Sequence, residues 1–132
     1  MIRAITDTHG LIWHVWDDPR MSARAQAVFD DAATAGEEIG VSSISLVEII
    51  YLAEKHKIDP DTLRRVLGLL DLGSYLVEVP VDRPLLAAIG SIPRSEVPDM
   101  PDRIIAATAI HLGVPLVSRD GKIRASSVVT IW

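Results

Sequence analysis

Short apolar segments alternate along the chain with longer segments in which apolar residues recur at helical spacing, and this alternation limits the possible folds more than any other feature. Buried strands are predicted at residues 2–6, 38–42, 75–79, 114–118 and 128–132. The segments between them read as helices, as between Ser22, an expected N-cap, and Gly36, an expected end. Strands that alternate with helices pair in parallel through right-handed crossovers. The sequence therefore predicts an α/β fold with one central parallel sheet and helices on both faces.

Turn and capping residues divide the rest of the chain. Asp59-Pro60 is a typical helix start, because an N-cap residue stands before a proline at the first helical position, and Gly73 is expected to end that helix. Residues 91–101, SIPRSEVPDMP, contain three prolines and are predicted to form an ordered loop. A further helix is expected over residues 104–112. Since no repeat or internal boundary is visible, residues 1–132 are interpreted as one domain.

The composition is typical of a folded domain in a reducing compartment. Hydrophobic residues make up 48% of the chain and the mean hydropathy is +0.27, which argues against disorder. The absence of cysteine excludes disulfides and thiolate-bound zinc. Charges in the first residues, MIRAITDTHG, stand where a signal peptide needs an apolar stretch, and no apolar run approaches the ~18 residues of a membrane span. We therefore expect a cytoplasmic protein without a membrane segment.

Carboxylates stand at equivalent places, just after an expected strand or at the start of an expected helix. These acids are Asp7, Glu48, Asp102 and Asp120. In an alternating β/α chain such positions gather in the crevice beyond the carboxyl ends of the strands, where ligands bind. Acids brought together repel one another, and a hard cation such as Mg²⁺ removes that conflict because it prefers carboxylate oxygen. The pattern predicts a metal site built from acids, which is typical of phosphate chemistry.

Each of these acids also has a purely structural interpretation. Asp7 can be the N-cap of the next helix, and Asp120 can belong to an Asp-Gly turn. Glu48 can complete a capping box at the start of its own helix. Asp102 falls in the first turn of a helix that Asp99 can cap, where an acid favours the helix dipole. Capping explains any one of these residues more readily than it explains all of them together.

Motifs for other catalytic chemistries are missing from the chain. The histidines show no H-E-x-x-H spacing and are expected at the surface or in packing roles. There is no G-x-S-x-G nucleophile motif, and neither of the glycine-rich motifs that cradle nucleotide phosphates is present. Trp13 and Trp16 flank the first helix and are expected in the buried core in preference to base stacking. These absences leave the acids as the main candidates for chemistry.

Taken in order, four segments resemble those of PIN-domain ribonucleases, and specifically of the VapC toxins of bacterial toxin–antitoxin pairs. The segments are DTHGLIW, VSSISLVEI, DMPDRIIAATA and LVSRDGKI. The resemblance covers essentially the whole chain, and the order and spacing of the segments are more specific than any one of them. It implies a metal-dependent endoribonuclease in which Asp7, Glu48, Asp102 and Asp120 form an acid quartet that binds Mg²⁺ or Mn²⁺.

The resemblance also suggests roles for single residues. Asp7 and Asp102 are the expected direct metal ligands, and Glu48 and Asp120 complete the site directly or through water. The bound ions would activate water for in-line attack on an RNA phosphodiester. None of the four acids of the family pattern is replaced in this chain, so loss of activity through a missing ligand is not indicated.

Residues beside the quartet match the family pattern or depart from it. Asp99 matches an acid often seen three residues before the third member of the quartet. Thr8 and Ser118 match small hydroxyl positions that could hold a metal-bound water. Gly10 is a departure, because a better helix former is usual there, and it is expected to loosen the first helix slightly.

The charge of the chain gives nucleic-acid binding only local support. The net charge of −5 counts against broad attraction to RNA, which usually shows as a basic face. Arg119, Lys122 and Arg124 form a small basic group beside Asp120, although an ordinary solvated turn explains that group equally well. Arg103 and Arg119 are candidate phosphate contacts, or alternatively surface ion-pair partners.

The resemblance implies partners, and two other functions stay open. The implied partners are an RNA substrate, a cognate antitoxin protein with a segment across the site, and a second copy of the chain in a homodimer. One alternative is a module of the same fold that mainly binds a protein and has negligible catalysis. The other is a phosphoacceptor receiver domain, which Asp82 and Lys122 would suit. A receiver has paired acids after its first strand, however, whereas Asp7 is followed by Thr8 and His9.

Overall fold

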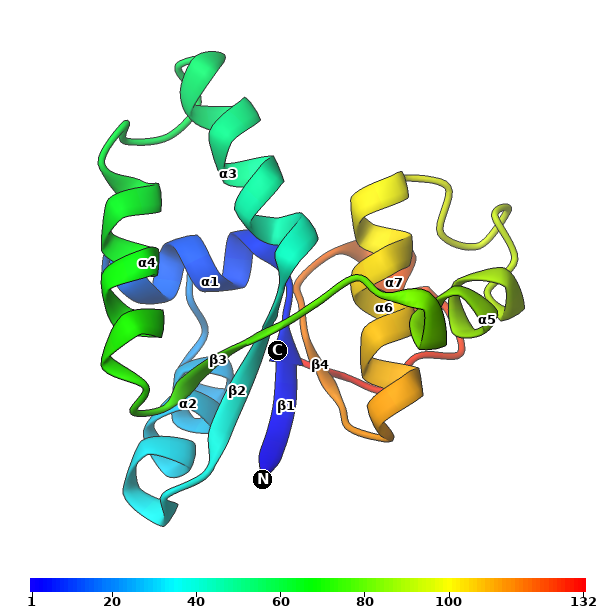
Figure 1. Ribbon diagram of the computed structural model, residues 1–132, viewed down its shortest axis with the longest axis horizontal. Helices are drawn as coiled ribbons and strands as arrows, with labels where there is room; N and C mark the ends of the chain where they lie inside the picture. The colour runs from blue at the N-terminus through cyan, green and yellow to red at the C-terminus, as the bar shows by residue number, and fades with distance from the viewer.

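Five parallel strands form one sheet in the order β3-β2-β1-β4-β5 (Figure 1). The computed structural model describes residues 1–132. The strands are β1 (Ile2–Thr6), β2 (Glu38–Ser42), β3 (Leu76–Val79), β4 (Leu116–Val117) and β5 (Thr130–Ile131). The predicted α/β fold with a parallel sheet is confirmed. β4 is shorter than predicted, in part because Pro115 has no N–H to donate to a ladder.

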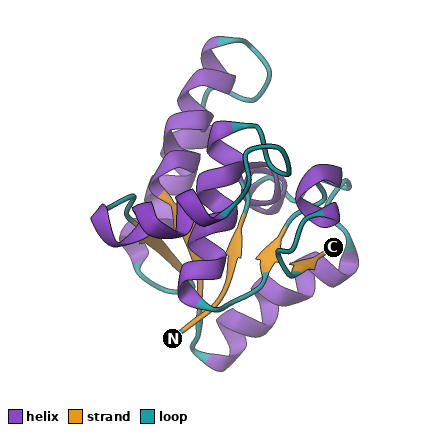
Figure 2. Ribbon diagram, turned by 90° about the vertical axis from the view of Figure 1, so that its right-hand side faces the viewer, coloured by secondary structure: helices purple, strands orange, loops and turns teal.

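Seven helices cover the sheet on both faces, as predicted. They are α1 (Thr8–Val15), α2 (Ala23–Ala35), α3 (Ser43–Glu54), α4 (Thr62–Leu72), α5 (Arg83–Ser91), α6 (Met100–Leu112) and α7 (Gly121–Ala125). In Figure 1, α1, α2 and α4 lie on one side of the strands and α5, α6 and α7 on the other. Figure 2 shows the strands in the middle of the molecule, between helices. None of the helices is both long and apolar enough to span a membrane.

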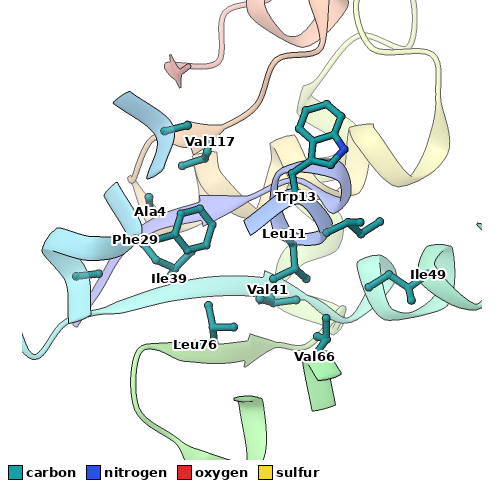
Figure 3. Close-up of a cluster of buried hydrophobic side chains, with 13 residues drawn as sticks. Ala4, Leu11, Trp13, Phe29, Ile39, Val41, Ile49, Val66, Leu76 and Val117 are labelled. Atoms are coloured by element: carbon teal, nitrogen blue, oxygen red, sulfur yellow. The ribbon is translucent and has the colours of Figure 1, made fainter. Parts of the chain in front are cut away.

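Two hydrophobic cores lie on opposite faces of the sheet, because successive side chains of a strand point to opposite faces. Ala4 of β1 belongs to the first core and Ile5 to the second. The first core joins β1, β2 and β3 to the helices α1 to α4, with Phe29 fully buried at its centre (Figure 3). The second core contains residues of α5, α6 and α7, including Ile105 and Ile123. Trp13 is 5% exposed, which confirms its predicted place in the core.

Both predicted ends of α2 agree with the structure, whereas the predicted start of α4 does not. The Ser22 hydroxyl caps α2 by accepting from the Ala25 N–H at 3.0 Å, and Gly36 ends that helix at a φ of 70°, a left-handed conformation that favours glycine. The start predicted at Asp59-Pro60 is wrong. Asp59 accepts the N–H of Asp61 at 2.8 Å and so shapes the turn before α4. Asp61 takes the N-cap position itself.

The start of α6 and the segment after β4 also differ from the predicted secondary structure. α6 begins at Met100, four residues before the predicted start, because Asp99 caps it and Pro101 suits its first turn. α7 was not predicted, since its five residues carry one buried apolar side chain, Ile123, and show no periodic pattern. Asp120 therefore begins a short helix, and the predicted Asp-Gly turn is absent.

The order of the strands defines where a ligand can reach the sheet. β1 and β4 are neighbours, and the N–H of Asp7 donates to the Val117 carbonyl at 3.0 Å. After β1 the chain enters α1 on one face, and after β4 it enters α7 on the other. Such a switch point opens a crevice beyond the carboxyl ends of the strands. Asp7 and Asp120 stand at this crevice.

Candidate active site

Asp7 is a buried carboxylate at the junction of β1 and α1. Its side chain is only 6% exposed, and Oδ1 accepts the Gly10 N–H at 2.7 Å. Asp7 is therefore the N-cap of α1, as the capping interpretation predicted. Burial raises the pKa of Asp7, while the Ser118 hydroxyl and the Gly10 N–H act against that rise. A cap does not need to be so deeply buried, so the position of Asp7 calls for a further partner.

Steric crowding explains why glycine stands at position 10, and the sequence prediction did not include this explanation. A Cβ at this position would stand 2.9 Å from Asp7 Oδ1 and 2.9 Å from Thr6 Oγ1, closer than real Cβ contacts. Glycine lets the first turn of α1 pass directly over the Asp7 carboxylate. The residue that departs from the family pattern is therefore one that fixes the geometry of the acid beside it.

Glu48 faces α1 from the second turn of α3. The Thr8 hydroxyl donates to Glu48 Oε1 and also lies 3.0 Å from Ser45 Oγ. The capping-box interpretation is wrong, because Ser42 is the N-cap of α3 and its hydroxyl accepts from the Ile44 N–H. Burial raises the pKa of Glu48, as do the charges of other acids, although the bond from Thr8 lowers it.

Asp102 shows most directly that the acids converge. It lies in the first turn of α6, where Asp99 is the N-cap and accepts the Asp102 N–H at 3.2 Å. Burial, followed by the like charges of four other acids, raises the pKa of Asp102 to about 7. Those charges belong to Asp99, Asp120, Glu48 and Asp7. Residues from four separate places in the sequence therefore lie within electrostatic reach of one carboxyl group.

Asp120 completes the group from the start of α7. Its Oδ1 accepts the N–H groups of Lys122 and Ile123, each at 3.0 Å, and its own N–H donates to Ser118 Oγ at 3.1 Å. Ser118, expected to hold a water, thus orients the backbone of Asp120. The second carboxylate oxygen of Asp120 has no hydrogen bond to the protein.

Asp7 and Asp120 line one hollow and Glu48 and Asp99 line another, whereas Asp102 lines neither. The first, of about 420 Å³, is lined by Asp7, His9, Trp13, Arg20, Arg119 and Asp120. The second, of about 350 Å³, lies between α3 and α6 and includes Glu48 and Asp99 among mainly apolar side chains.

The sequence prediction missed His9, whose charge lowers the pKa of both Asp7 and Glu48. Its place directly after Asp7-Thr8 was the one available signal.

The donor chemistry of these residues suits Mg²⁺ or Mn²⁺, because all the quartet's donors are carboxylate oxygens. Their mutual repulsion, visible in the pKa of Asp102, is a conflict that a cation relieves. No three histidine, aspartate or glutamate side chains already stand in a ligating arrangement. The residues therefore fit a divalent cation by chemistry and charge, and would have to turn toward it to bind.

The two candidate phosphate-binding arginines lie in different places. Arg103 Nε donates to the Ile92 carbonyl at 3.0 Å, and its side chain lines a separate hollow with Arg94 and Met100. Arg119 lines the same hollow as Asp7 and Asp120, with its guanidinium 4.5 Å from the centre of the Trp13 ring. Arg119 is the arginine that the structure brings to the acids.

Comparison with known proteins identifies the class to which this chain belongs. The family model of the PIN domain matches residues 4–127, so the chain belongs to the PIN domain family. A similar sequence is Ribonuclease VapC22 of Mycobacterium tuberculosis, 29% identical over 135 residues that span all of both chains. This relative agrees with the resemblance drawn from the sequence motifs.

Solved structures share the fold at lower sequence identity. The VapBC2 structure from Rickettsia felis, bound to a DNA fragment from its promoter, has a TM-score of 0.71 at 20% identity, covering 98% of this chain and 97% of that chain. A toxin–antitoxin complex from Klebsiella pneumoniae has a TM-score of 0.63 at 19% identity, covering 98% and 96%. FitAcB from Neisseria gonorrhoeae has a TM-score of 0.60 at 24% identity, covering 98% and 96%.

Proposed function

We propose that residues 1–132 act as one metal-dependent endoribonuclease domain that hydrolyses RNA phosphodiester bonds as the toxin of a toxin–antitoxin pair. The observation that carries this proposal is the convergence of acids on Asp102, whose pKa is about 7. Membership of the PIN domain family and the similarity to a protein named as a ribonuclease support the choice of RNA as substrate.

The proposed site uses Asp7 and Asp102 as direct ligands, with Glu48 and Asp120 completing it directly or through water. When bound there, Mg²⁺ or Mn²⁺ would lower the pKa of an attacking water and offset charge on the phosphate. The protein's own contribution is to hold the carboxylates in place. The Gly10 N–H fixes Asp7, and the N–H groups at the start of α7 fix Asp120.

Hydrogen bonds leave part of this site free for a ligand. The Thr8 hydroxyl occupies Oε1 of Glu48, and Oε2 of that residue has no hydrogen bond to the protein. The carboxylate of Asp102 accepts no hydrogen bond from the protein. Its pKa of about 7 means that it carries a proton part of the time near neutral pH. Binding of a cation would complete its ionisation, because the cation favours the charged carboxylate.

We also propose that an antitoxin protein and a second copy of the chain are partners. The solved structures with this fold include toxin–antitoxin complexes. The outer side of α3 carries exposed apolar residues, among them Val47 at 45% and Tyr51 at 59% exposure. Exposed apolar side chains that gather on one helix are typical of surfaces that bind a protein.

Asp7→Asn tests the proposed function. The wild-type chain should cleave RNA in Mg²⁺ or Mn²⁺ and stop in EDTA, and Asp7→Asn should lose cleavage by at least about 100-fold, since even groups that support metal ligands contribute about 10- to 100-fold. Asp71→Asn is the matched control, because Asp71 is exposed on α4. Circular dichroism should show both variants folded. Full cleavage by folded Asp7→Asn would exclude the proposed role of Asp7.

A further inference from the structure

Two arginines share the ring of one tryptophan beside the acids. The guanidinium of Arg119 lies 4.5 Å, and that of Arg20 5.0 Å, from the centre of the Trp13 ring. Trp13 is 5% exposed and packs edge-on against Trp132, with ring centres 5.5 Å apart. Both arginines line the hollow of about 420 Å³ that also contains Asp7 and Asp120. A rigid, core-anchored ring therefore holds two cations at the edge of the proposed active site.

The two arginines differ in whether they already pair with an acid. Arg20 donates two hydrogen bonds to Asp18, from Nε to Oδ1 at 3.0 Å and from Nη2 to Oδ2 at 2.8 Å. Those bonds lower the pKa of Asp18 to about 2, so the pair carries almost no net charge. Arg119 takes part in none of the side-chain ion pairs of the structure. Stacking on a ring leaves the in-plane N–H groups of a guanidinium free, in the geometry that matches a phosphate.

Arg20 also lines a second hollow. This hollow, of about 360 Å³, is lined by Arg20, Lys57, His56 and Asp59, together with Asp18 and the apolar side chains of Ile12, Trp16 and Ile58. Asp59 already accepts the N–H of Asp61, and Asp18 is paired with Arg20. Lys57 has no ion-pair partner among the salt bridges of the structure. The two cations without an ion-pair partner, Arg119 and Lys57, therefore line two separate hollows that share Arg20.

We propose that the two hollows together form a groove, defined by Arg119, Arg20 and Lys57, that binds the sugar–phosphate backbone of an RNA strand on one side of the bond that is cut. Arg119 contacts a phosphate close to the acids, and Lys57 contacts one further along the strand. Because Trp13 is covered, no base can stack on it, and contacts to phosphate carry no sequence information. The groove therefore positions RNA of any sequence. This inference rests on the proposed ribonuclease function.

The test measures binding without requiring cleavage. A fluorescent single-stranded RNA is titrated with the full chain in EDTA at a series of salt concentrations. Loss of one phosphate contact should reduce the slope of log affinity against log salt by about 0.7 for a single strand. Arg119→Gln should show this loss together with weaker binding at low salt. Lys57→Gln should show it with a long RNA, and not with an oligonucleotide too short to span the groove.

Arg124→Gln is the matched control, because Arg124 is an exposed arginine on α7 outside the groove. It should leave the slope unchanged, and melting curves should show all variants folded. Equal slopes for Arg119→Gln and Arg124→Gln would overturn the groove inference. Loss of polyglutamate binding in Arg119→Gln with RNA binding intact would also overturn it, and would point to an acidic protein segment instead.

The same samples separate this inference from the proposed function. If the wild type cleaves RNA in Mg²⁺ while Arg119→Gln keeps the full slope, the ribonuclease stands and the groove inference fails. If Arg119→Gln loses the slope while the wild type cleaves no RNA in Mg²⁺ or Mn²⁺, the groove is supported and the ribonuclease fails.

Discussion

Helix α1 connects two polar regions of opposite character. Near its C-terminal end His14 stacks on Phe29 with ring centres 4.0 Å apart, and its ring nitrogens contact Gln26 Oε1 at 3.0 Å and the Tyr75 hydroxyl at 2.8 Å. At its N-terminal end Asp7 is more deeply buried than His14, yet several of its neighbours are acids. The histidine has neutral partners that satisfy both of its nitrogens. The acids repel one another.

This contrast in partners distinguishes a polar group that stabilises the fold, His14, from polar groups that are suited to bind a ligand, the acids. Burial lowers the pKa of His14, so the imidazole is neutral. The hydrogen-bond pattern assigns its proton to Nδ1, which donates to Gln26, while Nε2 accepts from Tyr75. Nothing of this kind satisfies Asp102, whose pKa of about 7 reflects burial and like charges. A half-buried acid left among like charges is typical of a functional site.

The largest effect on stability is expected in the satisfied region. His14→Ala should lower the free energy of unfolding by about 2–4 kcal/mol, because it removes a partly buried ring that stacks on Phe29 and leaves two hydrogen-bond partners unpaired. Denaturant unfolding followed by circular dichroism measures the change. His111→Ala is the control, since His111 is exposed in the last turn of α6. A loss no larger than that of the control would contradict the stabilising role of His14.

A smaller effect of the opposite sign is expected at the acids. Without metal, Asp102→Asn should raise the free energy of unfolding by about 1–2 kcal/mol, a figure reduced to allow for solvent screening at this half-buried group. The reason is that asparagine removes one of several like charges. Melting in EDTA measures the change, with Asp71→Asn as control. If Asp102→Asn melts lower than the wild type, the acids do not repel one another as described.

The smallest effects are opposite dependences on pH. Asp102 has a folded pKa of about 7 against an ordinary 3.8, so the folded protein binds more protons, and its contribution to stability falls as pH rises from about 4 to about 7. The pKa values of Asp7 and Glu48 are raised as well and act in the same direction. His14 has a lowered pKa, so its contribution rises with pH up to about 6.5.

Variants can separate these two slopes. Unfolding free energies of the metal-free protein measured from pH 4 to pH 7.5 should decline less steeply in Asp102→Asn than in the wild type. They should decline more steeply in His14→Gln, which cannot take up a proton on unfolding. Parallel curves for the wild type and both variants would show that neither group titrates as described.

Features that depend on a pattern within one segment could be predicted from the sequence, whereas contacts between distant segments could not. Residues 2–6 and 38–42 were predicted because each is an apolar run that carries its own pattern. The meeting of Asp7 and Asp120 at one hollow could be predicted because topology puts the ends of parallel strands together, while the role of the acid quartet stays a prediction. The stacking of Arg119 on Trp13 could not be predicted, since it joins the end of β4 to α1 and leaves no periodic trace in the sequence.

We propose that Asp7 and Asp102 bind one shared cation beyond the ends of β1 and β4. Crystals grown with Mn²⁺ test this through the anomalous scattering of the metal. We expect an anomalous peak within ligand distance of both carboxylates, and no such peak in Asp7→Asn. A wild-type crystal of the same fold that shows ordered Asp7 and Asp102 side chains and a Mn²⁺ peak elsewhere, or none, would contradict it.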